Sequence, residues 1–294
     1  MSEAPVAVPK NSTTVRFSIG TLAEWLAPKA VLDRAFQAWC TPPRPRRPRP
    51  PKDGRPFELE SPVGTMKAWE WGMRDDADLV LLVHGWGSSA VSMEKLARPL
   101  AEAGRQVIAV DLPAHGLSEG ETTNVVEMTR AVEAALWRFR PTAVIAHSLG
   151  ATATALALQL GPKLARAVLL APGEDMTYFA HAFTARAGLS QGIAVGLLSR
   201  IEQRVGIAPD ALSLRHHAPP VGTEVLVVHD PADPEVPWSH AQRLASNWGE
   251  RMKLVAAPGA GHHGMPRVQS IVSAAVDFAL DGTTRGAPIL ALTA

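Results

Sequence analysis

The chain has 294 residues, of which 46% are hydrophobic and 19% are charged, which is enough to build a sizeable buried core. Its formal net charge of +1 gives no electrostatic case for nucleic-acid binding. A single cysteine, Cys40, excludes an intrachain disulfide, and no apolar run approaches the ~20 residues that a membrane span needs. We therefore expect a cytoplasmic protein with no transmembrane segment.

The first 56 residues differ in composition from the rest of the chain. Apolar residues at helical spacing, beginning at Pro28, predict a helix that runs to about Trp39. The segment 41–52 is rich in proline and arginine, which favours an extended conformation. We expect this segment to be a stiff connector on the domain surface, with an arm that binds a membrane or a partner as the alternative.

A second region, residues 57–282, alternates strands with helices. Residues 57–60 and 65–71 alternate in polarity and predict an antiparallel hairpin. The pattern then predicts buried strands at 79–83, 106–110, 142–146, 165–170, 224–229 and 252–256, with helices near 90–103, 124–138, 149–160, 240–247 and 266–280. Such alternation indicates a mostly parallel sheet with helices on both faces, followed by a tail at 283–294.

One interval breaks the alternation of strands and helices. Between about 173 and 221 no convincing strand occurs, but two helical stretches are predicted at 178–187 and 192–205. An insertion after a parallel strand lies over the carboxyl edge of the sheet, where open α/β sheets carry their sites. We therefore predict a small helical cap over the site.

The motif Ala-His-Ser-Leu-Gly-Ala at 146–151 joins a predicted strand to a predicted helix. Such a strand–turn–helix with serine at the corner is typical of a nucleophile elbow, in which Ser148 would be raised above the sheet edge. The helix that follows would direct the Leu149 N–H toward a developing oxyanion. The sequence thus predicts a serine nucleophile, which requires a base and an acid elsewhere in the chain.

The base is expected in the glycine-rich loop after the last strand, and the acid in the loop after the strand before it. His262 follows Gly-Ala-Gly directly and is preferred over its neighbour His263. Asp233 is preferred over Asp230 and Glu235, because the chain must leave the strand before a carboxylate can turn back toward a histidine. Asp230 and Glu235 are expected to stabilise the loop or to be solvated.

The loop after the strand 79–83 reads His-Gly-Trp-Gly-Ser-Ser at 84–89. Its glycines allow the backbone to curl, so that the Trp86 N–H becomes the second oxyanion donor. We also expect four nearby residues to contact the substrate: His84, Gly85, His147 and Tyr178.

Five motifs in this order resemble the α/β-hydrolase superfamily over roughly residues 57–280. They are His84–Gly87, Asp111–Ser118, the elbow at Ser148, Asp233–Pro237 and Gly261–His262. The resemblance implies the α/β-hydrolase fold with a Ser148, Asp233 and His262 triad and an oxyanion hole at Trp86 and Leu149. It also implies that Asp111 and His115 are structural. The chain departs from the family pattern at Ala146 and Ala151, which we take to replace the first and last glycines of the elbow.

The predicted function is hydrolysis of carboxylic esters with small or medium, hydrophobic acyl groups. The alternatives are a thioesterase, a lactonase or a C–C bond hydrolase with the same triad, or a ligand receptor on the same scaffold. No cofactor is implied, and no metal site is expected, because adjacent histidines such as His216 and His217 point in different directions. The expected partner is a small-molecule ester.

Overall fold

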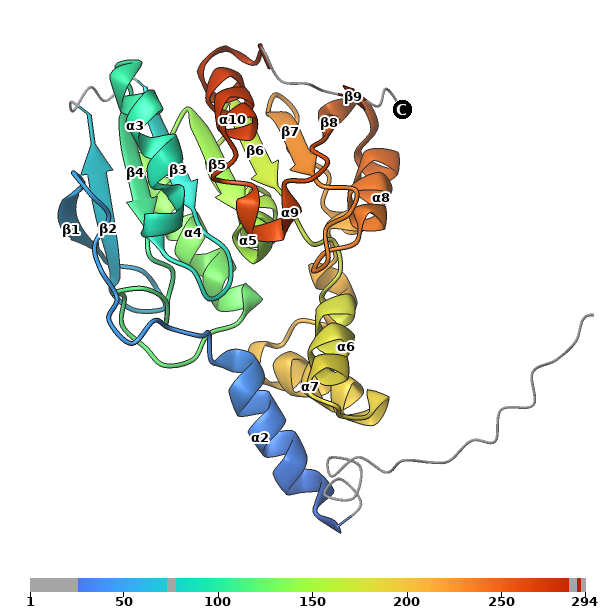
Figure 1. Cartoon of the computed structure of the whole chain (residues 1–294). Coiled ribbons are helices and arrows are strands. Elements are labelled where there is room, and N and C mark those ends of the chain that lie inside the picture. Colours follow the sequence, from blue (N-terminus) through green and yellow to red (C-terminus); the bar gives the residue numbers. More distant parts are fainter. Residues whose placement is uncertain (1–25, 73–77, 286–289, 292–294) are drawn as a thin grey trace, which may run out of the picture.

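The computed structural model describes residues 26–72, 78–285 and 290–291. Nine strands form one sheet in the order β1-β2-β4-β3-β5-β6-β7-β8-β9. The six central strands are parallel, and β1, β2 and β9 are antiparallel to their neighbours at the two edges (Figure 1). The strand bounds are β1 Arg55–Leu59, β2 Met66–Trp71, β3 Leu79–Val83, β4 Gln106–Val110, β5 Ala143–His147, β6 Arg166–Leu170, β7 Glu224–His229, β8 Met252–Ala256 and β9 Leu290–Ala291.

Every predicted strand is present, with bounds shifted by at most a few residues. The central strands are apolar at nearly every position because helices cover both faces of the sheet. The strand β9 was not predicted. It lies in the tail at 283–294 and pairs with the end of β8, through Ala256 and Leu290.

The helices divide between the two faces of the sheet. On one face, α3 (Glu94–Glu102) and α10 (Gln269–Asp281) share a buried cluster with the sheet. On the other face, α4 (Val125–Phe139), α5 (Ser148–Ala157) and α8 (Trp238–Trp248) share a second cluster. Together with the parallel strands, these two layers give the α/β-hydrolase fold that the sequence predicts.

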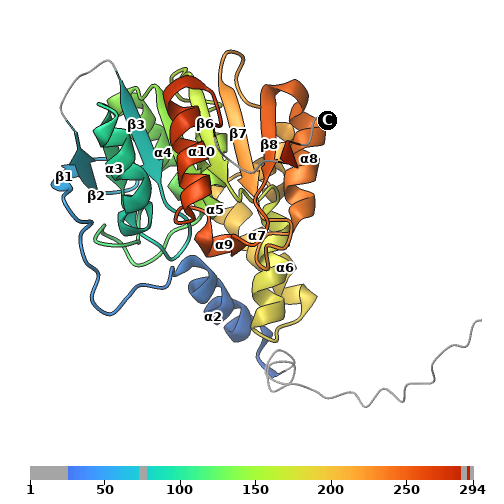
Figure 2. The ribbon, with the colours of Figure 1, turned by 45° about the horizontal axis from the view of Figure 1, so that its top comes forward.

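Three further helices lie together beyond the sheet edge at which β5 meets α5 (Figures 1 and 2). Two of them, α6 (Met176–Arg186) and α7 (Gln191–Val205), belong to the interval predicted as a cap. The third is α2 (Pro28–Cys40), which comes from the N-terminal region. Short 3-10 turns at Pro209–Leu212 and Leu214–His216 return the chain from α7 to β7.

A small apolar cluster holds α2 against the other two helices. Ala35 of α2 is buried with Ile193 and Leu197 of α7, and Phe183 of α6 packs against this group. Asp33 and Arg200 form an ion pair between α2 and α7. The N-terminal helix is therefore packed on α7 and is not a free appendage.

The proline- and arginine-rich segment between α2 and β1 runs along the domain surface as a strap, which we define as residues 41–54. Arg44 donates to the carbonyl oxygens of Ala114 and Ser118, at 2.7 and 2.8 Å. Farther along, the Trp71 indole N–H donates to the carbonyl oxygen of Lys52. These contacts fix the strap at both ends.

Candidate active site

Ser148 lies at the junction of β5 and α5 with a φ of +53°, in the left-handed region that few residues other than glycine adopt. A methyl group on Gly150 would overlap the carbonyl oxygen of His84, so this position admits only glycine. Gly150 is thus the closing glycine of the elbow, two residues after the serine. Our assignment of that place to Ala151 was wrong, and only the first glycine, at Ala146, is replaced.

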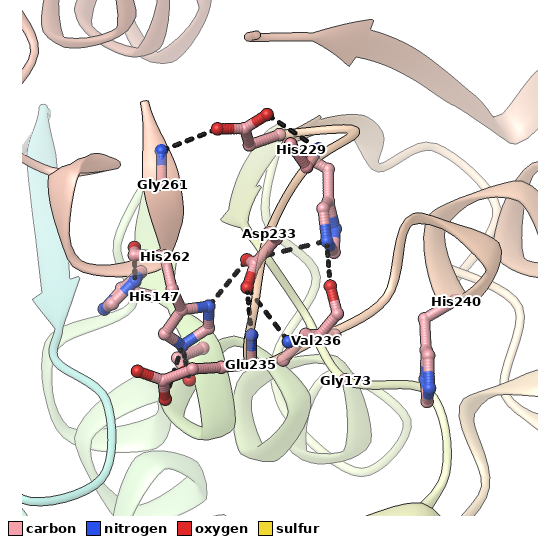
Figure 3. Close-up of polar contacts among 12 residues, drawn as sticks. His147, Gly173, His229, Asp233, Glu235, Val236, His240, Gly261 and His262 are labelled. Carbon is pink, nitrogen blue, oxygen red and sulfur yellow. Dashed lines mark hydrogen bonds and ion pairs between the residues drawn. The ribbon is translucent and has the colours of Figure 1, made fainter. Parts of the chain in front are cut away.

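The structure brings Ser148, His262 and Asp233 into one hydrogen-bonded chain. Figure 3 shows the link between His262 and Asp233. The Ser148 Oγ lies 2.7 Å from His262 Nε2, and His262 Nδ1 lies 2.7 Å from Asp233 Oδ2. An ionised carboxylate can only accept, so Nδ1 carries the imidazole proton and Nε2 is free to accept from the serine hydroxyl. All three side chains are buried.

The Asp233 carboxylate is held by its own loop as well as by His262. Its Oδ1 accepts the backbone N–H groups of Glu235 and Val236, at 2.8 and 2.9 Å. Burial by itself would raise the pKa of Asp233, but the hydrogen bonds from His262 and from these two N–H groups outweigh it, so the pKa lies below its usual value. Asp233 therefore stays ionised beside His262.

The alternatives to Asp233 and His262 were Asp230 and His263. In the structure these two side chains bond to other groups. Asp230 is buried and accepts the backbone N–H of Ala232 and of Gly261, at 2.9 and 2.6 Å. The His263 side chain is 72% exposed and pairs with Glu235 at 2.8 Å. Asp230 thus stabilises the loop, as expected for it, and is not solvated.

Two histidines that surround this chain of groups had no predicted role in positioning it. His147 Nε2 donates to the carbonyl oxygen of His262 at 3.0 Å, and burial lowers the pKa of His147 to about 3. His229 Nε2 donates to the carbonyl oxygen of Val236 at 2.8 Å and lies 3.7 Å from Asp233 Oδ2. Both act on loop backbone. Their position at the last residue of β5 and of β7 is the signal that could have indicated this.

The two predicted oxyanion donors, Trp86 and Leu149, line the same cavity as Ser148. Leu149 is in the first turn of α5, where backbone N–H groups have no partner within the helix. Trp86 packs edge-to-face on the His115 ring. Gly85 lies so close to the serine that a Cβ on it would be 2.8 Å from the Ser148 Cβ.

A cavity of about 230 Å³ opens over Ser148 and His262. Its walls come from α2, α4, α6, α7 and the loops after β3 and β7. The apolar lining residues are Trp39, Trp86, Val125, Leu149, Met176, Phe179, Ala182, Phe183, Leu198, Ile201, Pro209, Leu212 and Val236. Trp39 and Cys40 were not predicted as lining residues, because a proline-rich connector separates their helix from the rest of the fold in sequence.

Three of the four residues expected to contact substrate have side chains with other partners. His84 is buried and accepts the Leu112 N–H at Nε2, His147 bonds to His262, and the Tyr178 hydroxyl donates to the carbonyl oxygen of Glu235. None of the three belongs to the cavity lining, whereas Phe179, next to Tyr178, does. On α6 it is therefore Phe179, one residue after Tyr178, that lines the cavity.

The described ranges contain no cluster of three or more His, Cys, Asp or Glu side chains that could hold a metal ion. Among the helices of the described part, none has the length and apolar character to cross a membrane.

Comparison with known proteins agrees with this architecture. Residues 78–191 match the family described as alpha/beta hydrolase fold, and residues 209–287 match the family described as TAP-like protein. The chain belongs to the α/β-hydrolase superfamily. This α/β-hydrolase is 29% identical over 123 residues to a serine hydrolase-like protein of Danio rerio, a match that covers 39% of the chain and 36% of the relative.

A second curated relative matches over a segment of the same length. The chain is 27% identical over 123 residues to a serine hydrolase-like protein of Dictyostelium discoideum, covering 38% of the chain and 34% of that relative. The matched segments thus span about a third of the length of these two curated relatives. Both relatives are described as serine hydrolase-like.

Solved structures share the fold at low sequence identity. The Pyrococcus furiosus esterase Pf2001 superposes on this chain with a TM-score of 0.59 and 19% identity, and the match covers 81% of this chain and 97% of the esterase. Mouse alpha/beta hydrolase domain-containing protein 10 gives a TM-score of 0.61 and 16% identity, covering 77% of this chain and 97% of that protein. At such identities the likeness concerns the fold alone.

Proposed function

We propose that this α/β-hydrolase cleaves carboxylic esters of small or medium, hydrophobic acyl groups through an acyl-enzyme formed on Ser148. The observation that carries the proposal is the unbroken chain of hydrogen bonds from Ser148 Oγ through His262 to Asp233, each 2.7 Å long. Such a chain provides a nucleophile, a base with the required tautomer and an acid that stabilises the imidazolium.

In the first half of the reaction, the serine hydroxyl loses its proton to His262 Nε2 as Oγ attacks the ester carbonyl carbon. The carbonyl π electrons move to oxygen, and the backbone N–H groups of Trp86 and Leu149 stabilise that oxyanion. The oxyanion then re-forms the carbonyl and expels the alkoxide, which takes the proton from His262. An acyl ester on Ser148 and a free alcohol result.

The second half repeats these steps with water as the nucleophile. His262 Nε2 takes a proton from water as the water oxygen attacks the acyl carbon. Collapse of the second tetrahedral intermediate returns the proton to Ser148 Oγ and releases the carboxylic acid. Asp233 remains ionised throughout, consistent with its lowered pKa, and fixes the orientation of the imidazole.

The cavity walls support a hydrophobic acyl group. Phe179, Phe183, Leu198 and Ile201 line it from α6 and α7, and Trp39 lines it from α2. We infer that residues 57–282 form the catalytic domain with a cap at about 173–221, and that α2 completes this cap. A cavity of about 230 Å³ matches a short or medium chain better than a long one.

The test is release of p-nitrophenol from acyl esters of increasing chain length, measured for the wild type beside Ser148→Ala. We expect the wild type to turn over short and medium chains and Ser148→Ala to fall to background. If the wild type cleaves no ester, the proposal fails, and the same pair is then assayed on thioesters, lactones and C–C substrates. Ligand binding without any turnover would favour a receptor on this scaffold.

A further inference from the structure

Two polar residues interrupt the apolar wall of the cavity. Thr123 and Asn124 end the loop that precedes α4, and both line the cavity. Both are strongly buried, with exposed fractions of 0% and 6%. They lie beside the end of α2, because the Thr123 N–H donates to the carbonyl oxygen of Cys40 at 2.8 Å.

The hydrogen bonds of Asn124 fix the orientation of its amide. The side-chain oxygen accepts the N–H groups of Val126 and Glu127, at 3.0 and 3.1 Å, and so caps the N-terminus of α4. Both partners are donors, so the oxygen must face the helix and Nδ2 must face away from it. Asn124 Nδ2 has no hydrogen-bond partner among the described residues.

The Thr123 hydroxyl also lacks a hydrogen-bond partner among the described residues. Its oxygen is buried. Other buried side-chain atoms share this condition, but within the described ranges only these two belong to residues that line the cavity. The two unpartnered groups are thus adjacent in sequence and share one wall.

Unpaired buried polar groups have an energetic consequence for whatever fills the cavity. Leaving a buried donor unsatisfied costs free energy, and a wholly apolar chain cannot remove that cost. An oxygen atom on the chain can, because the amide supplies two N–H donors and the hydroxyl can donate or accept. Thr123 and Asn124 are uncharged, and the two charged lining residues, Arg186 and Glu235, are of opposite sign, which suits a neutral oxygen better than a carboxylate.

We propose that Thr123 and Asn124 form a polar subsite for a neutral oxygen function, oxo or hydroxyl, carried on the substrate chain at a distance from the scissile ester. The proposal rests on the proposed ester hydrolysis and names its substrate class: chains that carry an oxygen are preferred over plain alkanoyl chains. The amide binds the oxygen by donation, and the hydroxyl of Thr123 donates to an oxo group or accepts from a ligand hydroxyl.

The test measures binding in the Ser148→Ala background, where no ligand is consumed. The ligands are methyl octanoate and its singly oxo- or hydroxy-substituted analogues, with the oxygen at each position along the chain, titrated by calorimetry. We expect one substitution position to lower the Kd by about tenfold relative to methyl octanoate. The two kinds of analogue show which oxygen function is preferred.

Two further substitutions, added singly to Ser148→Ala, test the assignment. Asn124→Asp keeps the capping oxygen and removes the Nδ2 donors, and Thr123→Val keeps the shape and removes the hydroxyl. The quantity compared is the Kd of methyl octanoate divided by the Kd of its best oxygen-substituted analogue. We expect Asn124→Asp to bring this ratio near one and Thr123→Val to lower it. Thermal melts of both variants verify the fold.

Equal Kd values at every substitution position would overturn the subsite, as would a preference that survives both substitutions or a failure to bind any of these ligands. Failure of the proposed function is a separate result, because it is measured as absence of ester cleavage by the wild type. Preferential binding of an oxygenated ligand by a protein that cleaves no ester would leave the subsite in place and remove the esterase.

Discussion

The Asp230 carboxylate accepts the backbone N–H of Gly261 at 2.6 Å, which ties the loop after β7 to the loop after β8. Asp233 belongs to the first of these loops, His262 belongs to the short helix α9 (Gly261–Gly264) that follows the second, and both lie close to that tie (Figure 3). Two carboxylates in one loop therefore hold different parts of the neighbouring loop: Asp230 its backbone, and Asp233 its imidazole.

This division of labour predicts different effects for Asp233→Asn and Asp230→Asn. Asp233→Asn should lower kcat by about 10³–10⁴-fold, because an amide can stabilise the wrong imidazole tautomer and cannot stabilise the imidazolium. Asp230→Asn should have a much smaller effect on kcat and should mainly lower the thermal midpoint. Steady-state kinetics with the best p-nitrophenyl ester and melting curves measure both. A larger kinetic loss in Asp230→Asn would reverse the assignment.

An added methyl group should be far more harmful at Gly150 of the elbow than at Gly192 of α7. Gly150→Ala places a Cβ over the backbone oxygen of His84, so we expect a loss of about 1–3 kcal/mol in unfolding free energy and about 10²-fold in kcat through displacement of Ser148. The control is Gly192→Ala in α7, where the nearest atom, Ser190 Oγ, would be 3.5 Å away. There alanine should stabilise the helix by about 0.5–1 kcal/mol. Denaturant unfolding of the two variants compares them directly.

Trp39 is expected to limit the length of the acyl chain. It lines the cavity from α2, so Trp39→Ala should enlarge the cavity and move the optimum of kcat/KM toward longer p-nitrophenyl esters. The matched control is Trp137→Ala on α4, whose side chain is 46% exposed and lies outside the cavity lining. An unchanged chain-length profile in a folded Trp39→Ala protein would mean that α2 does not bound the acyl site.

Because His240 is buried, we expect the free energy of unfolding to fall in mild acid. His240 Nδ1 accepts the Glu174 N–H at 3.1 Å, and burial, followed by the charge of Arg243, lowers the pKa of His240 to about 4. Between pH 6.5 and 4 the unfolded chain therefore binds a proton that the folded chain does not, and stability falls as pH falls, by at most about 1.4 kcal/mol per pH unit.

Replacing His240 should remove this contribution. His240→Gln keeps an acceptor for the Glu174 N–H but does not titrate, so its unfolding free energy should fall less steeply between pH 6.5 and 4. Urea unfolding at a series of pH values gives the two slopes. Equal slopes would mean that folding does not lower the affinity of His240 for protons.

The sequence predicted the sheet, the elbow and the order of the site loops because each has a local signal. Continuous apolar strands such as Leu79–Val83 occur where both faces of a sheet are covered, and Ser148 stands at a strand-to-helix corner. The choice of Asp233 over Asp230 used the length of loop needed to turn back toward His262, and in the structure Asp233 lies 2.7 Å from His262 Nδ1.

What could not be predicted depends on contacts between distant segments. Nothing near Trp39 in sequence indicates that α2 packs on α7, because its apolar face would suit any apolar partner. The roles of His147 and Tyr178 were misplaced because one-residue differences in direction along a strand or helix decide whether a side chain faces the cavity. The strand β9 has only two residues, too few for any periodicity.

The packing of α2 on α7 also sets an order of events during synthesis. α2 is made early, whereas α7 lies about two thirds of the way along the chain, so the apolar face of α2 stays without its partner while the central strands are translated. The strap can dock through Arg44 as soon as the loop at Ala114 exists, and it then holds α2 close to where α7 will form. We therefore expect closure of the cavity to be among the last steps of folding, and we expect the strap to shorten the search that precedes it.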